Sequence, residues 1–488
     1  MTDAAEFARA VLIVAVGFAA AILSSRLSGW LRVPAPALFL AVAAVSSDVT
    51  PSITPLLSIR DVERTCLVAL IVILFDGGMD IGRERFRRSL WPMVLLGVPG
   101  TFAVAGLLSV FIHVVLGLPW TPSLLIGAAV APTDPAVMFS VLSGREVAGR
   151  SDDILKGESG VNDPVGIALV IGLLDAADSG GTGLTTILSD FALQMTVGLI
   201  VGVAGGLLLG RAMRRLTLPD EALYPLQALA GAGIVYGLAG ALHGSGFLAV
   251  FVAGVLVGDI RAPYKYEIEH VTSVLASLGE IVVFVALGLT IDIGSLDLRN
   301  VWLDGLVIAA ALTFLVRPLV VVALLSRADL RAGEKVFVSW AGLRGAVPIL
   351  LAAFALLDGA EQAQRIYGIV FVVVMFSVVV QGSLVSTVAR AAGVPMTETG
   401  QEPWHVSVRL RDEPRGVRRY VVAAGAPADG VAIRDLALGR QPWISLLIRD
   451  GAARQPRGST VLSAGDEVLL LGAGEDVREL FEGTAVAS

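Results

Sequence analysis

The segment Ala131-Pro132-Thr133-Asp134-Pro135 interrupts a long apolar run and decides how the surrounding chain folds. Two prolines so close together remove backbone hydrogen bonds, so an unbroken helix cannot pass through the Thr-Asp pair. The segment therefore predicts a membrane-spanning helix that is unwound in its middle. The carbonyl groups freed there, the Thr133 hydroxyl and a nearby carboxylate are the hard oxygen ligands that suit an alkali cation.

A second apolar run is interrupted at residues 340–348, where the sequence WAGLRGAVP combines glycines, a proline and one charge. Each interrupted run is the middle one of three consecutive apolar runs. Two broken helices in corresponding positions predict a transporter built from inverted repeats, with its site near the middle of the membrane. The alternative is that both are Pro-kinked helices that pack through small residues.

The composition is that of a membrane protein. The chain has 488 residues, of which 55% are hydrophobic and 16% charged, and its mean hydropathy is +0.79. A net charge of −7 and the lack of any recognition motif exclude nucleic acid as a partner. The single cysteine, Cys66, and four scattered histidines form no disulfide framework and no metal-ligand cluster. No hydrolase or phosphate-loop motif occurs, so we expect neither enzymatic activity nor a cofactor.

Apolar runs of membrane-spanning length predict about thirteen transmembrane helices in an all-α polytopic domain. The first run follows Asp3 and Glu6 rather than basic residues, so it is interpreted as a retained helix and not as a secretion signal. The expected limits of the spans are 7–25, 34–47, 63–79, 90–115, 120–142, 154–176, 184–210, 221–242, 244–258, 271–291, 301–325, 335–357 and 367–390.

The basic residues of the short loops predict the orientation. Fifteen Arg and Lys residues fall in the odd-numbered loops and at most four in the even-numbered loops. Because basic loops stay in the cytoplasm, the N-terminus is expected outside and the C-terminus inside the cell inner membrane.

The chain after the last span has a different pattern of apolar and charged residues, which predicts a second domain. Residues 1–392 are expected to form the membrane domain, 393–402 a linker and 403–488 a small cytoplasmic α+β domain. The expected strands are 417–423, 444–449 and 467–471, and residues 433–438 are expected to form one helical turn or two.

Three charged residues inside the apolar spans need a reason to be there, because a charge at the bilayer centre is costly. Glu158 and Asp163 are five residues apart, about 140° around a helix, so they can reach different partners. Arg344 is the natural countercharge for Glu158, since an unpaired buried charge costs far more than a pair. Asp163 is then left to exchange a proton for a cation, the alternative being that it caps or braces a helix.

The segments at 131–135, at 158–164 (ESGVNDP) and at 342–348 (GLRGAVP) resemble, in this order, the three signature segments of the monovalent cation:proton antiporters of the NhaP and sodium/hydrogen-exchanger branch. The resemblance covers roughly residues 7–392. It implies that Asp163 binds the cation and the proton, and that Thr133 and Ser159 help to coordinate the cation.

The same resemblance implies roles for the residues around the site. Asn162 with Asp134 shapes the crossing of the broken helices, Glu158 pairs with Arg344, and Arg317 is another charged position of the family. Asn162 in place of a second aspartate is similar to the branch that exchanges one cation for one proton without net charge movement.

The tail resembles the C-terminal lobe of TrkA-type domains that regulate potassium conductance, on Asp429-Gly430, on residues 433–436, 448–451 and 460–462, and on Gly465-Asp466. NhaP-type antiporters with such a lobe are often potassium/proton exchangers, and related lobes dimerise and bind small nucleotides. The resemblance therefore implies a homodimer with a possible small nucleotide ligand on this lobe.

The sequence predicts a potassium or sodium:proton antiporter that serves cation and pH homeostasis, in which cation and proton compete for Asp163. The choice between potassium and sodium stays open, because both are hard cations separated by cavity size and ligand number. Two other functions are consistent with the pattern: a gated cation channel under the same cytoplasmic lobe, and a membrane sensor that has kept a transport fold.

Overall fold

The structure is a computed structural model in which the chain forms two compact units, Met1–Val406 and Ser407–Ser488, each considered by itself. It describes residues 34–49, 58–134, 137–138, 145–147, 150–178, 184–260, 262–291, 294, 301–328, 330–398, 418–436, 438, 443–449, 452–471, 477 and 480–481.

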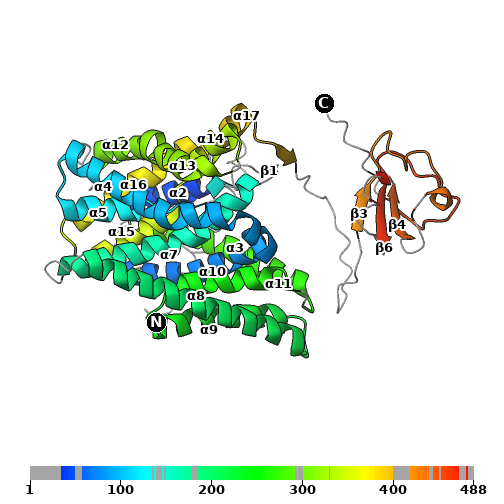
Figure 1. The fold of residues 1–488 in the computed structure, drawn as a ribbon, viewed down its shortest axis with the longest axis horizontal. Helices are drawn as coiled ribbons and strands as arrows, with labels where there is room; N and C mark the ends of the chain where they lie inside the picture. Colours follow the sequence, from blue (N-terminus) through cyan, green and yellow to red (C-terminus); the bar gives the residue numbers. More distant parts are fainter. Residues whose placement is uncertain are drawn as a thin grey trace. The chain divides into compact units, whose positions relative to one another are not determined.

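The first unit is built from helices that run side by side (Figure 1). Their bounds are α2 Ala35–Val49, α3 Ile59–Leu95, α4 Thr101–Phe111, α5 Trp120–Ala129, α7 Arg150–Asp178, α8 Leu184–Arg215, α9 Leu223–Ala241, α10 Gly246–Gly258, α11 Lys265–Leu289, α12 Leu303–Ala311, α13 Arg317–Leu324, α14 Ala332–Ala341, α15 Ala346–Asp358, α16 Ala363–Phe376 and α17 Val385–Ala391. Segments of π-helix occur at Leu96–Gly100, Ile112–Leu116, Leu312–Val316 and Ser377–Gly382.

The described residues contain seven helices that are long and apolar enough to cross a membrane, or eight if the bent pair α14–α15 is one span. One of the seven, Ile59–Leu116, is 58 residues long and has a kink at Gly82, where φ is +64°. The expected spans 63–79 and 90–115 lie on either side of this kink. The expected first span, residues 7–25, is outside the described residues, so the total of thirteen spans stays a prediction.

The helices pack into two hydrophobic cores. Helix α10 lies against α3, α8 and α9 and forms the smaller core with them, whereas α5, α7, α15 and α16 contribute to the larger core. Large apolar side chains on α8 and α9 point outward, as Ile200 and Ile234 do with 62% and 68% of their surface exposed. Such a surface suits contact with lipid.

A two-stranded antiparallel ribbon follows the last helix of the first unit. Strand β2, Met396–Glu398, pairs with β1, Arg145–Val147, so that Thr397 lies opposite Glu146. The predicted linker 393–402 therefore contains a strand of the first unit. The reason is that the chain leaving α17 meets the loop that precedes α7, and the sequence of either segment alone gave no indication of this pairing.

The second unit is a four-stranded antiparallel sheet in the order β3-β6-β4-β5. The strands β3 Arg418–Val421, β4 Trp443–Arg449 and β6 Glu467–Leu471 confirm the three predicted strands, and Ile433–Asp435 forms the expected helical turn. The short strand β5, Ala452–Arg454, was not predicted.

A partly buried ion pair joins the end of β4 to the residue that precedes β6. Arg449 donates hydrogen bonds to both carboxylate oxygens of Asp466, at 2.7 and 2.5 Å. Burial acts to raise the pKa of Asp466, but the hydrogen bonds from Arg449 and from the Ser463 backbone lower it below its ordinary value. The pair therefore stabilises the unit at neutral pH, and this contribution is lost as the pH falls through the lowered pKa.

Candidate functional site

The two unwound segments cross each other in the first unit. Helix α5 ends at Ala129 and the chain is non-helical from 130 to 134, while residues 342–345 separate α14 from α15, which are bent by 42°. At the crossing the Asp134 N–H donates to the Leu343 carbonyl oxygen at 2.7 Å. The structure thus confirms both breaks over these residues; Pro135 lies outside the described part.

Each unwound segment places one charged side chain against a helix end of the other broken span. Arg344 Nε donates to the carbonyl oxygen of Val130 at the C-terminal end of α5, at 3.0 Å. The Asp134 carboxylate lies against Gly345, immediately before the first turn of α15, where any β-carbon would collide with it. Cations are favoured at helix C-termini and anions at N-termini, so both contacts stabilise the crossing.

Helix α7 places three polar side chains beside the crossing. Asp163 is 5% exposed and Ser159, one turn earlier, hydrogen-bonds its carboxylate. Within the described part of the chain, Asp163 Oδ1 has no hydrogen-bond partner. Asn162 Nδ2 donates to the Thr133 hydroxyl at 2.8 Å and so ties α7 to the first unwound segment.

A cavity of about 1020 Å³ leads to this site and is lined by α3, α7, α10, α11 and α15. Asp163, Ser159 and Asp134 lie on its wall, whereas Thr133 does not. The rest of the wall is also rich in charged side chains: Asp76, Asp80, Arg85, Lys156, Asp259, Glu269 and Glu280. The sequence reasoning had not singled out Glu280, although it is an ionisable residue inside an expected span and the cost of burying a charge could have identified it.

The predicted ion pair between Glu158 and Arg344 is wrong: Glu158 pairs with Arg317. The two Arg317 Nη atoms donate to the two carboxylate oxygens of Glu158 at 2.5 and 2.8 Å, and both residues are at most 2% exposed. Arg317 begins α13 directly after a π-helical segment and packs on Gly342, which has no side chain to obstruct it.

Arg344 instead serves the unwound backbone. Besides Val130, its guanidinium donates to the Gly342 carbonyl oxygen, and its backbone N–H donates to the Ser377 hydroxyl at 2.9 Å. These partners explain why Arg344 does not pair with Glu158: the carbonyl groups left without a helical partner are closer at hand.

Gln381 completes the support of the second break. Its amide donates to the Trp340 carbonyl oxygen in the last turn of α14, at 2.5 Å, and accepts from the hydroxyls of Ser377 and Thr313. The Trp340 indole N–H donates in turn to the backbone carbonyl oxygen of Gln381 at 3.1 Å. Residues of the π-helical segments therefore hold the broken span in place.

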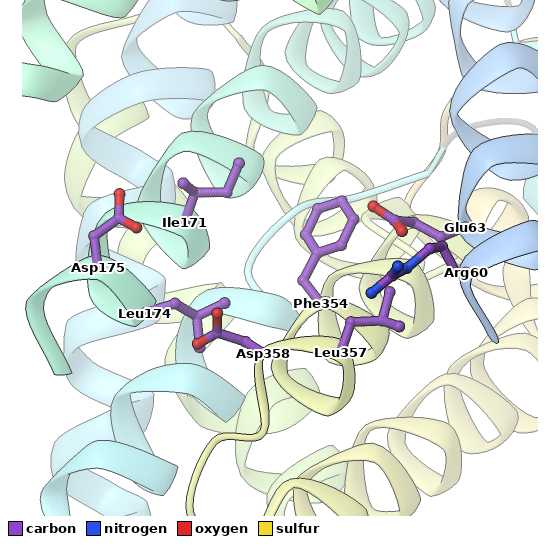
Figure 2. A pocket seen from close by; sticks show the side chains of 8 residues that line it. All are labelled: Arg60, Glu63, Ile171, Leu174, Asp175, Phe354, Leu357 and Asp358. Carbon is purple, nitrogen blue, oxygen red and sulfur yellow. The ribbon is translucent and has the colours of Figure 1, made fainter. Parts of the chain in front are cut away.

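A second pocket, of about 290 Å³, lies at the far end of the same helices (Figure 2). It is lined by Arg60 and Glu63 of α3, by Ile171, Leu174 and Asp175 of α7, and by Phe354, Leu357 and Asp358 of α15. The larger cavity reaches Cys66 on α3 and Leu350 on α15, one helical turn from Glu63 and Phe354. The layer that separates the two spaces is therefore thin on both helices.

Crossed broken helices around a buried carboxylate, at the end of a hydrophilic cavity, define a secondary ion transporter. Comparison with known families agrees: residues 13–391 match the model of the sodium/hydrogen exchanger transmembrane domain, and residues 417–482 match the TrkA-C domain. The chain belongs to the sodium/hydrogen exchanger family, whose members are monovalent cation:proton antiporters.

Similar proteins include two potassium/proton antiporters. The chain is 32% identical to the K(+)/H(+) antiporter NhaP2 of Shewanella oneidensis, over 96% of this chain and 82% of that protein. It is 35% identical to the K(+)/H(+) antiporter NhaP of Alkalimonas amylolytica, over 85% and 72% of the two chains. The sodium proton antiporter MjNhaP1 of Methanocaldococcus jannaschii has the same fold, with a TM-score of 0.67 at 22% identity over 78% of this chain and all of that one.

Proposed function

We propose that this protein exchanges a potassium or sodium ion for a proton across the cell inner membrane, and that the two ions compete for Asp163. The observation that carries the proposal is the buried Asp163 carboxylate, which reaches the end of a hydrophilic cavity with one oxygen unpartnered among the described residues. The two potassium/proton relatives favour potassium.

The chemistry at the site is a competition for one negative charge. The ionised Asp163 carboxylate and the Ser159 hydroxyl supply hard oxygen ligands for an alkali cation, with Thr133 fixed nearby by Asn162. A proton on Asp163 removes the charge that holds the cation, so one ion leaves as the other binds. Because Arg317 neutralises Glu158, we propose that only one charge is exchanged and that transport is electroneutral.

Exchange also requires that the site open to each side in turn. The large cavity is the open side here, and we propose that the pocket of Figure 2 is the closed opposite end of the same path. Ile171 in that pocket is eight residues from Asp163 along α7, about 12 Å. Rocking of the helices around α7 and α15 against α3, α10 and α11 would close one space and open the other.

The proposal is tested by adding potassium, sodium or choline to vesicles that contain the purified protein and an acidic interior, while a dye reports the internal pH. We expect potassium or sodium to release protons and choline to have no effect. Flux without an opposing proton movement would identify a channel instead, and cation binding without any flux would identify a sensor.

The first prediction is that Asp163→Asn abolishes exchange, because the amide keeps the shape of the side chain but cannot carry the titrating charge. Asp153→Asn is the matched control on the same helix, since Asp153 does not line the cavity, and it should retain exchange. Cation-driven proton release by a correctly inserted Asp163→Asn protein would contradict the mechanism.

The second unit is proposed to regulate transport and not to perform it. The buried ionisable groups of the site all belong to the first unit, whereas the second is a small sheet domain of TrkA-C type. We propose that it faces the cytoplasm, that it contributes to a homodimer, and that a small nucleotide is its ligand.

A further inference from the structure

Helix α11 presents a polar face to the large cavity, although it lies within an apolar span. The cavity-lining polar residues of α11 recur every three or four positions and so share one face of the helix. They are Tyr266, Glu269, His270, Ser273, Ser277 and Glu280. Another face carries Val274 and Leu278, which are 54% and 41% exposed and apolar. The polar residues of α11 are therefore gathered on the side that lines the cavity, whereas another side of the helix is apolar.

Glu280 is the innermost ionisable residue of this polar face. It lies ten residues beyond His270, or about 15 Å deeper along the helix axis. Its Oε1 atom is buried, and no described residue donates a hydrogen bond to it. A carboxylate placed in this way inside a membrane span requires a partner, and here none comes from the described protein.

The deep end of the cavity holds negative charge only, as far as the described lining residues show. Asp134 is within electrostatic range of both Asp163 and Glu280. The Lys and Arg side chains of the wall are engaged elsewhere: Lys156 pairs with Asp80 at 2.7 Å, and Arg85 donates to the Asp80 carbonyl oxygen at 2.5 Å.

The unpartnered Asp163 Oδ1, on a side chain only 5% exposed, is a second and independent sign that this space is built for a ligand. Carboxylate oxygens that line one hydrophilic cavity are complementary to a desolvated alkali cation.

We propose that Glu280 is a second cation-binding residue of the translocation path, which receives the potassium or sodium ion in the cavity and passes it to Asp163. The inference rests on the proposed antiport. It assigns to α11, across the cavity from α7, a carboxylate that sets how tightly the cation is held on the open side, while Asp163 carries out the exchange.

The test compares Glu280→Gln with Glu280→Asp and with Glu267→Gln, a control on the same helix whose side chain does not line the cavity. In vesicles, Glu280→Gln should raise the apparent KM for potassium and sodium about tenfold and leave the maximal rate within about twofold, because one attractive charge is lost. Glu280→Asp should restore part of the affinity, and Glu267→Gln should match the unaltered protein.

Binding of potassium and sodium to the purified full-length proteins, measured by calorimetry, separates this inference from the antiport itself. Weaker binding by Glu280→Gln supports the inference even if the intact protein proves to exchange no protons. Unchanged KM and unchanged binding in Glu280→Gln would overturn it, as would a lower maximal rate at unchanged KM, which would indicate a role in packing. If Glu280→Gln fails to fold, Glu280→Asp carries the test. Weaker cation binding by Glu280→Asp, with unchanged binding by Glu267→Gln, supports the inference, and binding by Glu280→Asp as tight as in the unaltered protein overturns it.

Discussion

At the scale of single residues, the site handles its buried charges in two opposite ways. Glu158 is fully compensated, since Arg317 holds both of its oxygens. Among the described residues, Asp163 has only a serine hydroxyl as a partner and one unpartnered oxygen, so its charge is left to be met by an ion from solution. A carboxylate of the first kind stabilises a fold, and one of the second kind suits ion exchange.

The pairing of Glu158 can be tested by double-mutant cycles. Glu158→Gln or Arg317→Gln alone should destabilise the protein by roughly 3–5 kcal/mol, because either leaves an unpaired buried charge, and the double variant should cost clearly less than the sum. The measurement is thermal unfolding of the purified protein. In the parallel cycle with Arg344→Gln the coupling should be smaller, and a larger coupling with Arg344 than with Arg317 would contradict the assigned pair.

At the scale of elements, the two broken spans depend on each other. The Leu343 carbonyl oxygen accepts from Asp134, and Arg344 binds the end of α5, so neither half-helix end is satisfied by its own span. The unbroken helix α7 and the half-helix α15 run from the large cavity to the pocket of Figure 2, where Phe354 projects between Ile171 and Glu63. These helices can therefore link events at the two ends.

We expect that fixing α3 to α15 at the small pocket stops exchange, because the closed end could no longer open. Glu63→Cys and Phe354→Cys, placed in a Cys66→Ser background that leaves no other thiol, would be joined by a bifunctional thiol reagent. Vesicle assays should show loss of exchange on cross-linking and recovery when a cleavable linker is reduced. The same reagent on Leu199→Cys and Val203→Cys, both exposed on α8, is the control. Full exchange by the cross-linked Glu63/Phe354 pair would show that the pocket does not open.

At the scale of the whole molecule, the β1–β2 ribbon offers a route from the second unit to the site. Strand β2 follows the last helix and precedes the second unit, and β1 ends three residues before α7, the helix that carries Glu158 and Asp163. A force on the chain after β2 would act on the start of α7 through this pairing. An effector on the tail could shift transport by a coupling of about 1–3 kcal/mol, or roughly 5- to 150-fold.

Removal of the second unit should change the regulation of exchange and spare exchange itself. The chain is best cut after Val406, because an earlier cut would remove β2. Proton release is measured across a range of pH, with and without nucleotides, and its pH dependence should shift in the truncated protein. Thr397→Pro in the full chain should cause a similar shift, because proline breaks the β1–β2 ribbon. An inserted truncation that binds no cation at any pH would place the tail in the transport machinery, and an unchanged profile would exclude regulation.

The sequence by itself determined the membrane class, both unwound segments and the three longer strands of the tail. Each follows from a local property: the length of an apolar run, prolines and glycines that cannot continue a helix, or an alternating pattern between turns. The resemblance of three segments also pointed to Asp163, whose role in ion exchange stays a prediction.

Only the tertiary structure decided which charges meet. The sequence favoured Arg344 as the partner of Glu158, but the pairing with Arg317 depends on the π-helical turn before Arg317 and on the bare surface of Gly342. The pairing of β1 with β2 and the presence of Glu280 and Asp163 on the wall of one cavity likewise depend on how distant segments come together. Spacing along one chain segment fixes which side chains share a face, but the distance between two faces is set by how the helices pack.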